Sequence, residues 1–112
     1  MAYDQHLAER VRELLAEEAG VVEKAMFGGL AFLIGGHMAV SVSGRGGLLL
    51  RCEPSQTQAL SAKPHAGPFE MRGREMDGWL RIEPQGVATK AQLRRWVSRG
   101  VDYARSLPPK GA

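Results

Sequence analysis

The chain has 112 residues, which is the usual size of one domain and enough to bury a core without disulfides or a structural metal. Apolar residues make up 44% of it and charged residues 24%, and this balance excludes a long disordered or low-complexity chain. The net charge of +3 is too small to indicate a nucleic-acid-binding protein by composition, so that function would need a local basic patch.

The first segment predicts an amphipathic helix. Asp4 is a suitable N-cap, and Gly20 is expected to end the helix. Between them apolar residues recur at helical spacing: Leu7, Val11, Leu14, Leu15 and Ala19.

The next thirty residues change to β-branched, aromatic and glycine residues, which predicts three meandering antiparallel strands. The strands are expected at Lys24–Ile34, His37–Ser43 and Leu48–Arg51. Glycine pairs and runs at 35–36 and 44–47 are suited to the hairpin turns, because glycine tolerates positive φ. Within the first strand, Gly28 and Gly29 indicate a bulge or a close approach of another backbone segment.

The second half predicts a short helix, two strands and a long helix. Pro54 suits the first turn of the short helix, which is expected to run to about Ala62, and residues 63–68 are expected to form a loop. Strands are predicted at Phe69–Arg72 and Trp79–Glu83. Thr89 is expected to cap the last helix, which Pro108 and Pro109 then end.

The predicted fold is α+β, a single domain at residues 1–107 followed by a short tail at 108–112. The element order is α-β-β-β-α-β-β-α, with a five-stranded antiparallel sheet flanked by helices. Side chains that alternate along 38–42, together with Leu80 and Ile82, predict one buried face. A meander also leaves an edge strand, so a homodimer formed through that edge is one expectation.

A single cysteine, Cys52, excludes an internal disulfide framework and favours a reducing compartment. The N-terminal residues mix charged and apolar side chains and contain no signal-peptide core. The longest apolar run, Leu30–Ile34, is too short to span a bilayer. We therefore expect a cytoplasmic protein without membrane contact.

No catalytic, cofactor-binding or metal-binding set is predicted. Nothing in the spacing of Cys52, His6, His37 and His65 brings a thiol and a base together or matches metal-ligand spacing, and a packed core thiol is the favoured interpretation of Cys52. The glycine-rich segments match no phosphate-binding motif. Three carboxylates lie close in sequence, but solvated turn charges are their favoured interpretation: Glu70, Glu75 and Asp77.

One charge feature is concentrated. Basic residues of the last helix fall opposite its apolar face, interrupted by Asp102: Lys90, Arg94, Arg95, Arg99 and Arg105. Such a stripe is typical of a solvated helix face or of a contact surface for phosphates or an acidic partner. We take Arg94, Arg95, Arg99 and Arg105 as the candidate interaction surface.

Two blocks carry a resemblance to a known family. The first is 24–33 with its Met26-Phe27-Gly28-Gly29 centre, followed by 36–38, and the second runs from Gly73 through Gly78 to Trp79. With the closing segment 104–110, they make the chain similar to the N-terminal domain of the TfoX/Sxy family. The resemblance spans nearly the whole chain. Asp77 stands where many relatives carry a basic residue.

The resemblance implies an antiparallel α+β fold and regulation rather than catalysis. Full-length relatives regulate natural competence and help a cyclic-AMP receptor protein to activate promoters. They carry a C-terminal helical domain that this chain, which stops at Ala112, is expected to lack. We therefore expect a non-catalytic interaction module with a protein partner, such as the transcription machinery. Two alternatives stay open: weak direct DNA binding, and a small-molecule binder or hydrolase with a pocket near Phe27, His37 and Trp79.

Overall fold

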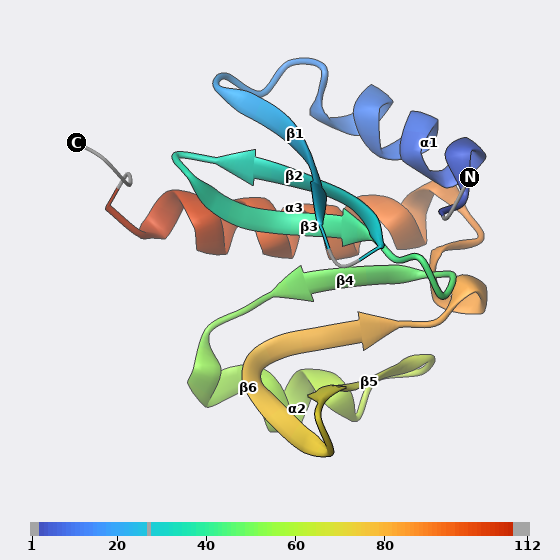
Figure 1. Ribbon diagram of the computed structural model, residues 1–112, viewed down its shortest axis with the longest axis vertical. Coiled ribbons are helices and arrows are strands. Elements are labelled where there is room, and N and C mark those ends of the chain that lie inside the picture. Colours follow the sequence, from blue (N-terminus) through green and yellow to red (C-terminus); the bar gives the residue numbers. More distant parts are fainter. Residues whose placement is uncertain (1–2, 27, 109–112) are drawn as a thin grey trace.

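The computed structural model describes residues 3–26 and 28–108. Its described elements comprise six strands, three α-helices and two short 3-10 turns, and the six strands form one antiparallel sheet in the order β1-β2-β3-β4-β6-β5 (Figure 1). In the described residues no helix is long and apolar enough to cross a membrane. The α+β class and the antiparallel sheet are therefore confirmed.

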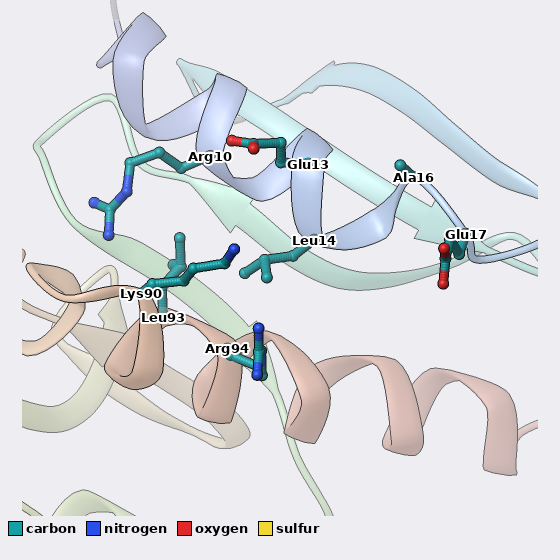
Figure 2. Close-up of a pocket in the computed structure, with 8 residues that line it drawn as sticks. All are labelled: Arg10, Glu13, Leu14, Ala16, Glu17, Lys90, Leu93 and Arg94. Atoms are coloured by element: carbon teal, nitrogen blue, oxygen red, sulfur yellow. The ribbon is translucent and has the colours of Figure 1, made fainter.

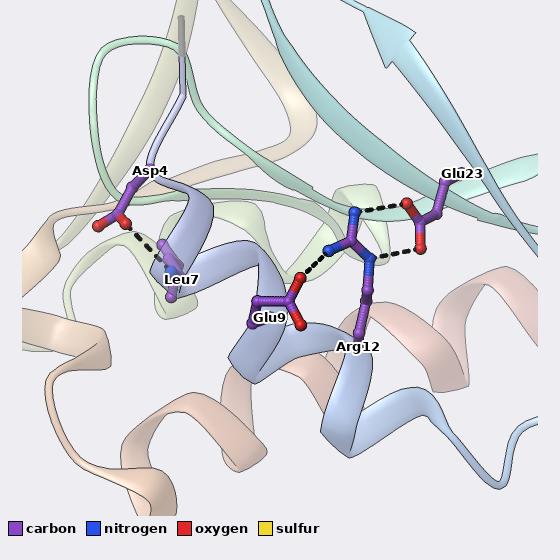
Figure 3. A network of polar contacts seen from close by, with 5 residues as sticks. All are labelled: Asp4, Leu7, Glu9, Arg12 and Glu23. Atoms are coloured by element: carbon purple, nitrogen blue, oxygen red, sulfur yellow. Dashed lines mark hydrogen bonds and ion pairs between the residues drawn. The ribbon is translucent and has the colours of Figure 1, made fainter. Parts of the chain in front are cut away.

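Helix α1 (Gln5–Leu15) begins where the sequence predicted, because the Asp4 carboxylate accepts a hydrogen bond from the Leu7 backbone N–H at 3.1 Å (Figure 3). The helix ends at Leu15, so the prediction that Gly20 ends it was wrong. Gly20 instead takes a φ of +74° in the loop that leads into β1.

Arg12 joins α1 to β1 (Val21–Met26). Its guanidinium donates two hydrogen bonds to Glu23, at 2.7 and 2.8 Å, and also contacts Glu9 (Figure 3). The hydrogen bond from Arg12 lowers the pKa of the Glu23 carboxyl. The N-terminal helix is thereby held against the first edge of the sheet.

The predicted first strand is two strands. β1 and β2 (Gly29–Ile34) form a hairpin in which Met26 pairs with Gly29, so the sheet has six strands rather than five. Gly28 lies in the turn with a φ of +74°, which corrects the prediction of a bulge inside one strand. The close backbone approach is present at Gly29, where an added Cβ would lie 2.1 Å from the Val42 carbonyl oxygen of β3.

The middle of the sheet is formed by β3 (His37–Val42) and β4 (Leu48–Arg51), close to the predicted bounds. The short predicted helix begins as a 3-10 turn at Pro54–Gln56 and continues as α2 (Thr57–Ser61). A second 3-10 turn at Pro84–Val87 precedes α3 (Lys90–Ser106).

The second hairpin differs from the prediction. β5 (Ala66–Met71) includes half of the expected loop at 63–68, and β6 (Arg74–Ile82) begins five residues before Trp79. The turn between them contains only Arg72 and Gly73, both with positive φ. An arginine at such a position is unusual, and therefore the sequence did not indicate this turn. Pro68 is tolerated because β5 is an edge strand.

All three helices pack against one face of the sheet, as Figure 1 shows for α3 behind the central strands. The core between them is the larger of two apolar clusters and contains, among others, Val11, Phe32, Leu50, Leu80 and Leu93. Leu80 and Ile82 are fully buried there, as predicted. The opposite, helix-free face carries a smaller cluster of Ala31, Met38 and Leu49.

This second cluster changes one prediction. Residues 38–42 of β3 are all buried, so the expected alternation between a buried and an exposed face fails in that strand. The reason is that the helix-free face is covered locally by side chains from both hairpins, including Met26, Leu33, Phe69 and Trp79. The tail predicted at 108–112 lies outside the described residues except for Pro108.

Candidate interaction surface

Helix α3 carries the basic residues that the sequence singled out, and its start is fixed by a capping box. The Thr89 hydroxyl accepts from the Gln92 backbone N–H at 3.1 Å, and the Gln92 side chain accepts from the Thr89 N–H at 2.9 Å. One side of the helix is buried in the core through Leu93, Trp96, Val97, Gly100, Val101 and Ala104. The basic side chains therefore project from the remaining sides.

The contact between α3 and the sheet is close. Phe32 pairs with Val40 and Leu33 pairs with Met38, which leaves Ala39 as the extra residue of a β-bulge. A Cβ added at Gly100 would lie 2.3 Å from the Ala39 carbonyl oxygen. Only glycine allows this distance, so α3 lies flat on the sheet.

Arg105 has a structural partner. Its guanidinium donates to the Glu18 carboxylate at 2.7 Å and to the Ala19 carbonyl oxygen at 3.2 Å. These contacts tie the end of α3 to the loop between α1 and β1. Arg105 was predicted as part of an interaction surface, but its charge is already neutralised within the fold.

Arg95 and Arg99 lie together with Lys63, from the loop before β5. The three cations surround a hollow of about 200 Å³ that Trp96 and His65 also line. The Arg99 guanidinium lies 5.7 Å from the centre of the Trp96 ring, a cation–π distance. Within the described residues none of the three cations has a carboxylate partner within 4 Å. We call Lys63, Arg95 and Arg99 the α3 surface.

Arg94 faces a different neighbour. It lies with Lys90 in a groove of about 430 Å³ between α1 and α3, whose lining side chains are drawn in Figure 2. The other wall of this groove carries Glu13 and Glu17. Because charges of both signs line it, the groove does not have the uniform positive character of the α3 surface.

Sequence reasoning missed Lys63 and His65, because the loop that holds them is separated from α3 by the whole second hairpin. The main chain of His65 explains their position: its carbonyl oxygen accepts from the Glu83 N–H at 2.8 Å, just before the turn that leads to α3. No spacing signal in the sequence could have indicated this neighbourhood.

The glycines of the predicted signature have conformational roles. Gly73 has a φ of +77° in the second hairpin turn, and Gly78 has a φ of +85° inside β6. The Gly78 N–H donates to the Thr57 hydroxyl at 2.7 Å, while its carbonyl oxygen accepts from the Cys52 N–H at 2.9 Å. Together with the close approach at Gly29, these contacts explain why the blocks contain glycine.

The remaining signature residues lie on the helix-free face. Met26 ends β1 and packs against the small cluster. The centres of the Trp79 and Phe69 rings lie 5.8 Å apart. The Arg51 guanidinium lies 5.3 Å from the centre of the Trp79 ring. Phe27 lies outside the described residues.

Of the three residues expected near the alternative pocket, Phe27, His37 and Trp79, the structure describes His37 and Trp79. His37 begins β3, and its Nε2 donates to the Pro108 carbonyl oxygen at 2.6 Å, whereas Trp79 is in β6 with β4 between them. Neither residue lines the hollows described above. The structure does not bring them together.

The other titratable candidates are also apart. Cys52 is buried with its sulfur 3.9 Å from the Thr57 hydroxyl, and burial raises the pKa of its thiol, which is the opposite of an activated nucleophile. Glu70, Glu75 and Asp77 are exposed on the second hairpin. Within residues 3–26 and 28–108 no three His, Cys, Asp or Glu side chains gather as a metal site requires.

Comparison with known families identifies the chain. The model of the TfoX N-terminal domain matches residues 13–104, so the chain belongs to that family, and the resemblance inferred from the sequence is confirmed. Among curated proteins and among solved structures, none matches it.

Proposed function

We propose that the chain is a non-catalytic interaction module that contacts an acidic surface of a protein partner through the α3 surface. The supporting observation is that Lys63, Arg95 and Arg99 surround one hollow without a carboxylate partner among the described residues. Three neighbouring unneutralised cations attract an anionic partner over several ångströms and favour its association.

The family supports a regulatory role at a coarse level, because the matched model is that of the TfoX N-terminal domain. Full-length members of the family act together with a cyclic-AMP receptor protein. That protein and its transcription partners are therefore the first candidates to test.

Direct DNA binding is the second candidate function, and α3 is poorly placed for it. A helix that reads a groove must project from the domain, whereas α3 is pressed on the sheet at Gly100 and buried along Leu93, Trp96 and Val97. Three cations can contact about three phosphates, which gives non-specific binding with a log–log salt slope near −3. Such binding is weak at physiological salt.

The hydrolase alternative requires a histidine or thiol oriented by a carboxylate. His37 contacts a backbone carbonyl and Cys52 contacts a hydroxyl, so neither has that geometry among the described residues. Cytoplasmic location and a homodimer formed through an edge strand remain proposals. Edge strand β1 is exposed along Val22, Glu23, Lys24 and Ala25, and Val22 is 58% exposed, which makes β1 the edge to examine first.

The test compares wild type with the double variant Arg95→Glu/Arg99→Glu. Binding is measured by biolayer interferometry to purified cyclic-AMP receptor protein, to its transcription partners and to duplex DNA, across a salt series. The matched control is Lys24→Glu/Arg74→Glu, which changes the net charge equally at exposed positions outside the α3 surface. Loss of a protein complex in the first variant alone supports the proposal. Tight, sequence-selective binding of the isolated chain to DNA would contradict it.

A further inference from the structure

A second cationic hollow, which shares no residue with the α3 surface, lies on the helix-free face of the sheet. Its volume is about 540 Å³, and its walls come from the β3–β4 turn, from β4 and β6, and from the end of β5. Arg45, Arg72 and Arg81 line it, as do the apolar side chains of Leu49 and Phe69. A volume of this size is in the range of pockets that hold small organic molecules.

The three arginines of this hollow carry unbalanced charge. Arg12 and Arg105, on the other side of the molecule, are each paired with a glutamate. No carboxylate of the described residues lies within 4 Å of Arg45, Arg72 or Arg81 in an ion pair. The hollow contains one acidic side chain, Glu70, against three guanidiniums, so its net charge is positive.

One of these guanidiniums is held in place. Arg81 donates from Nη1 to the Ser43 hydroxyl at 3.2 Å and from Nη2 to the Arg45 carbonyl oxygen at 3.4 Å. Ser43 is itself buried and lines the hollow. Because Arg81 is oriented before any ligand arrives, less side-chain entropy is lost when an anion binds.

The position of Arg72 also indicates a role. Arg72 and Gly73 form a two-residue turn with φ values of 54° and 77°, the type I′ geometry in which Asn-Gly is strongly preferred. An arginine strains the backbone there, whereas asparagine would not. The fold therefore accepts strain at the one turn residue that brings a third guanidinium to the hollow.

The apolar part of the hollow lies beside these charges. Leu49 is only 4% exposed, and Phe69 packs with its ring 5.8 Å from Trp79. We propose that this hollow binds a small organic anion: its carboxylate or phosphate group is held by Arg45, Arg72 and Arg81, and its apolar or aromatic part lies against Leu49 and Phe69. The site is independent of the α3 surface.

The test is a titration followed by ¹⁵N–¹H chemical shifts with four probes: phenyl phosphate, 3-phenylpropionate, inorganic phosphate and benzyl alcohol. Saturable shifts at Ser43, Leu49, Phe69 and Arg81 are expected with one or both aromatic anions, and the tighter one identifies the preferred anionic group. Inorganic phosphate and benzyl alcohol are expected to bind at least about tenfold more weakly, because each lacks one half of the recognised chemistry. Equal binding of either one, or no binding of the aromatic anions, would overturn the proposal.

Arg72→Asn is the decisive variant. Asparagine suits the turn, so the melting temperature is expected to stay the same or rise, while affinity for the aromatic anion falls about tenfold because a charge-assisted hydrogen bond is lost. Arg45→Ala is expected to weaken binding similarly. Arg74→Asn is the matched control on the same hairpin and leaves affinity unchanged. Unchanged affinity in Arg72→Asn and Arg45→Ala would refute the site.

Discussion

The two faces of the sheet differ in what covers them. The helix-covered face packs three helices against an apolar core that contains Val40, Leu50 and Leu80, each with no exposed surface. The helix-free face has only the small cluster of Ala31, Met38 and Leu49, with aromatic and arginine side chains around it. One face therefore provides stability, and the other combines a partial core with open, charged surface that is available for binding.

Two neighbouring leucines of β4 test this difference most directly. Leu50 faces the helix-covered core and Leu49 faces the small cluster. We expect Leu50→Ala to lower the free energy of unfolding by about 4 kcal/mol, because the enclosed site cannot collapse, and Leu49→Ala by about 2 kcal/mol, because its site borders an open hollow. Urea denaturation of both variants measures the difference. Equal losses would mean that the two faces are equally well packed.

Gly100 tests how closely α3 is held to the helix-covered face. Gly100→Ala places a Cβ against the Ala39 carbonyl oxygen, and we expect a loss of about 2 kcal/mol although alanine is the better helix former. Ser98→Ala, at an exposed position of the same helix, is the control and should change stability by less than about 0.5 kcal/mol. A stabilised Gly100→Ala variant would show that α3 can lift from the sheet at no cost.

Thr57 tests the connection between α2 and β6. Its hydroxyl accepts from the Gly78 N–H and donates to the Pro54 carbonyl oxygen at 2.8 Å. Thr57→Val leaves a buried N–H without its partner, and we expect a loss of about 1.5 kcal/mol in the free energy of unfolding. The amide of Gly78 should also exchange faster with deuterium. Unchanged exchange would mean that another group satisfies this N–H.

The smallest effect is expected for Glu23, whose ion pair with Arg12 joins β1 to α1. The folded-state pKa of its carboxyl is lowered by Arg12, so this ion pair adds stability above the unfolded-state pKa and loses it as the pH falls through the folded-state pKa. Because both side chains are partly exposed, solvent screens this ion pair and its contribution to stability is small. The free energy of unfolding of Glu23→Gln and of the wild type is measured by urea denaturation from pH 7 to pH 3. The variant is expected to be less stable at pH 7, and the two values should converge only at the acidic end.

The sequence predicted the features that depend on local chemistry. The caps at Asp4 and Thr89, the strands of the middle of the sheet and the buried residues Leu80 and Ile82 follow from periodicity and from side-chain hydrogen bonds. The first hairpin was missed because its glycines, Gly28 and Gly29, lie within an apolar run that contains no polar turn residue. The second was missed because an arginine stands where asparagine or glycine would have signalled the turn.

The candidate site could be predicted only in part, because the sequence shows local spacing but not long-range partners. The basic stripe on α3 is visible in the sequence because helical spacing is regular. Whether each arginine is available depends on long-range partners: Arg105 meets Glu18, which is 87 residues away, while Arg95 meets Lys63. The hollow on the helix-free face draws its residues from three separate segments, so no local pattern predicts it.

The place of α3 in the chain has a consequence for how the protein emerges from the ribosome. The sheet is complete at Ile82, yet the helix that covers β3 and β4 is made only after all six strands, and it provides Leu93 and Trp96 to the core. Until residue 106 has left the exit tunnel, the nascent chain exposes an apolar sheet face to chaperones and to other nascent chains. Folding is therefore expected to be complete only after α3 has emerged, with aggregation risk concentrated in the interval before it does.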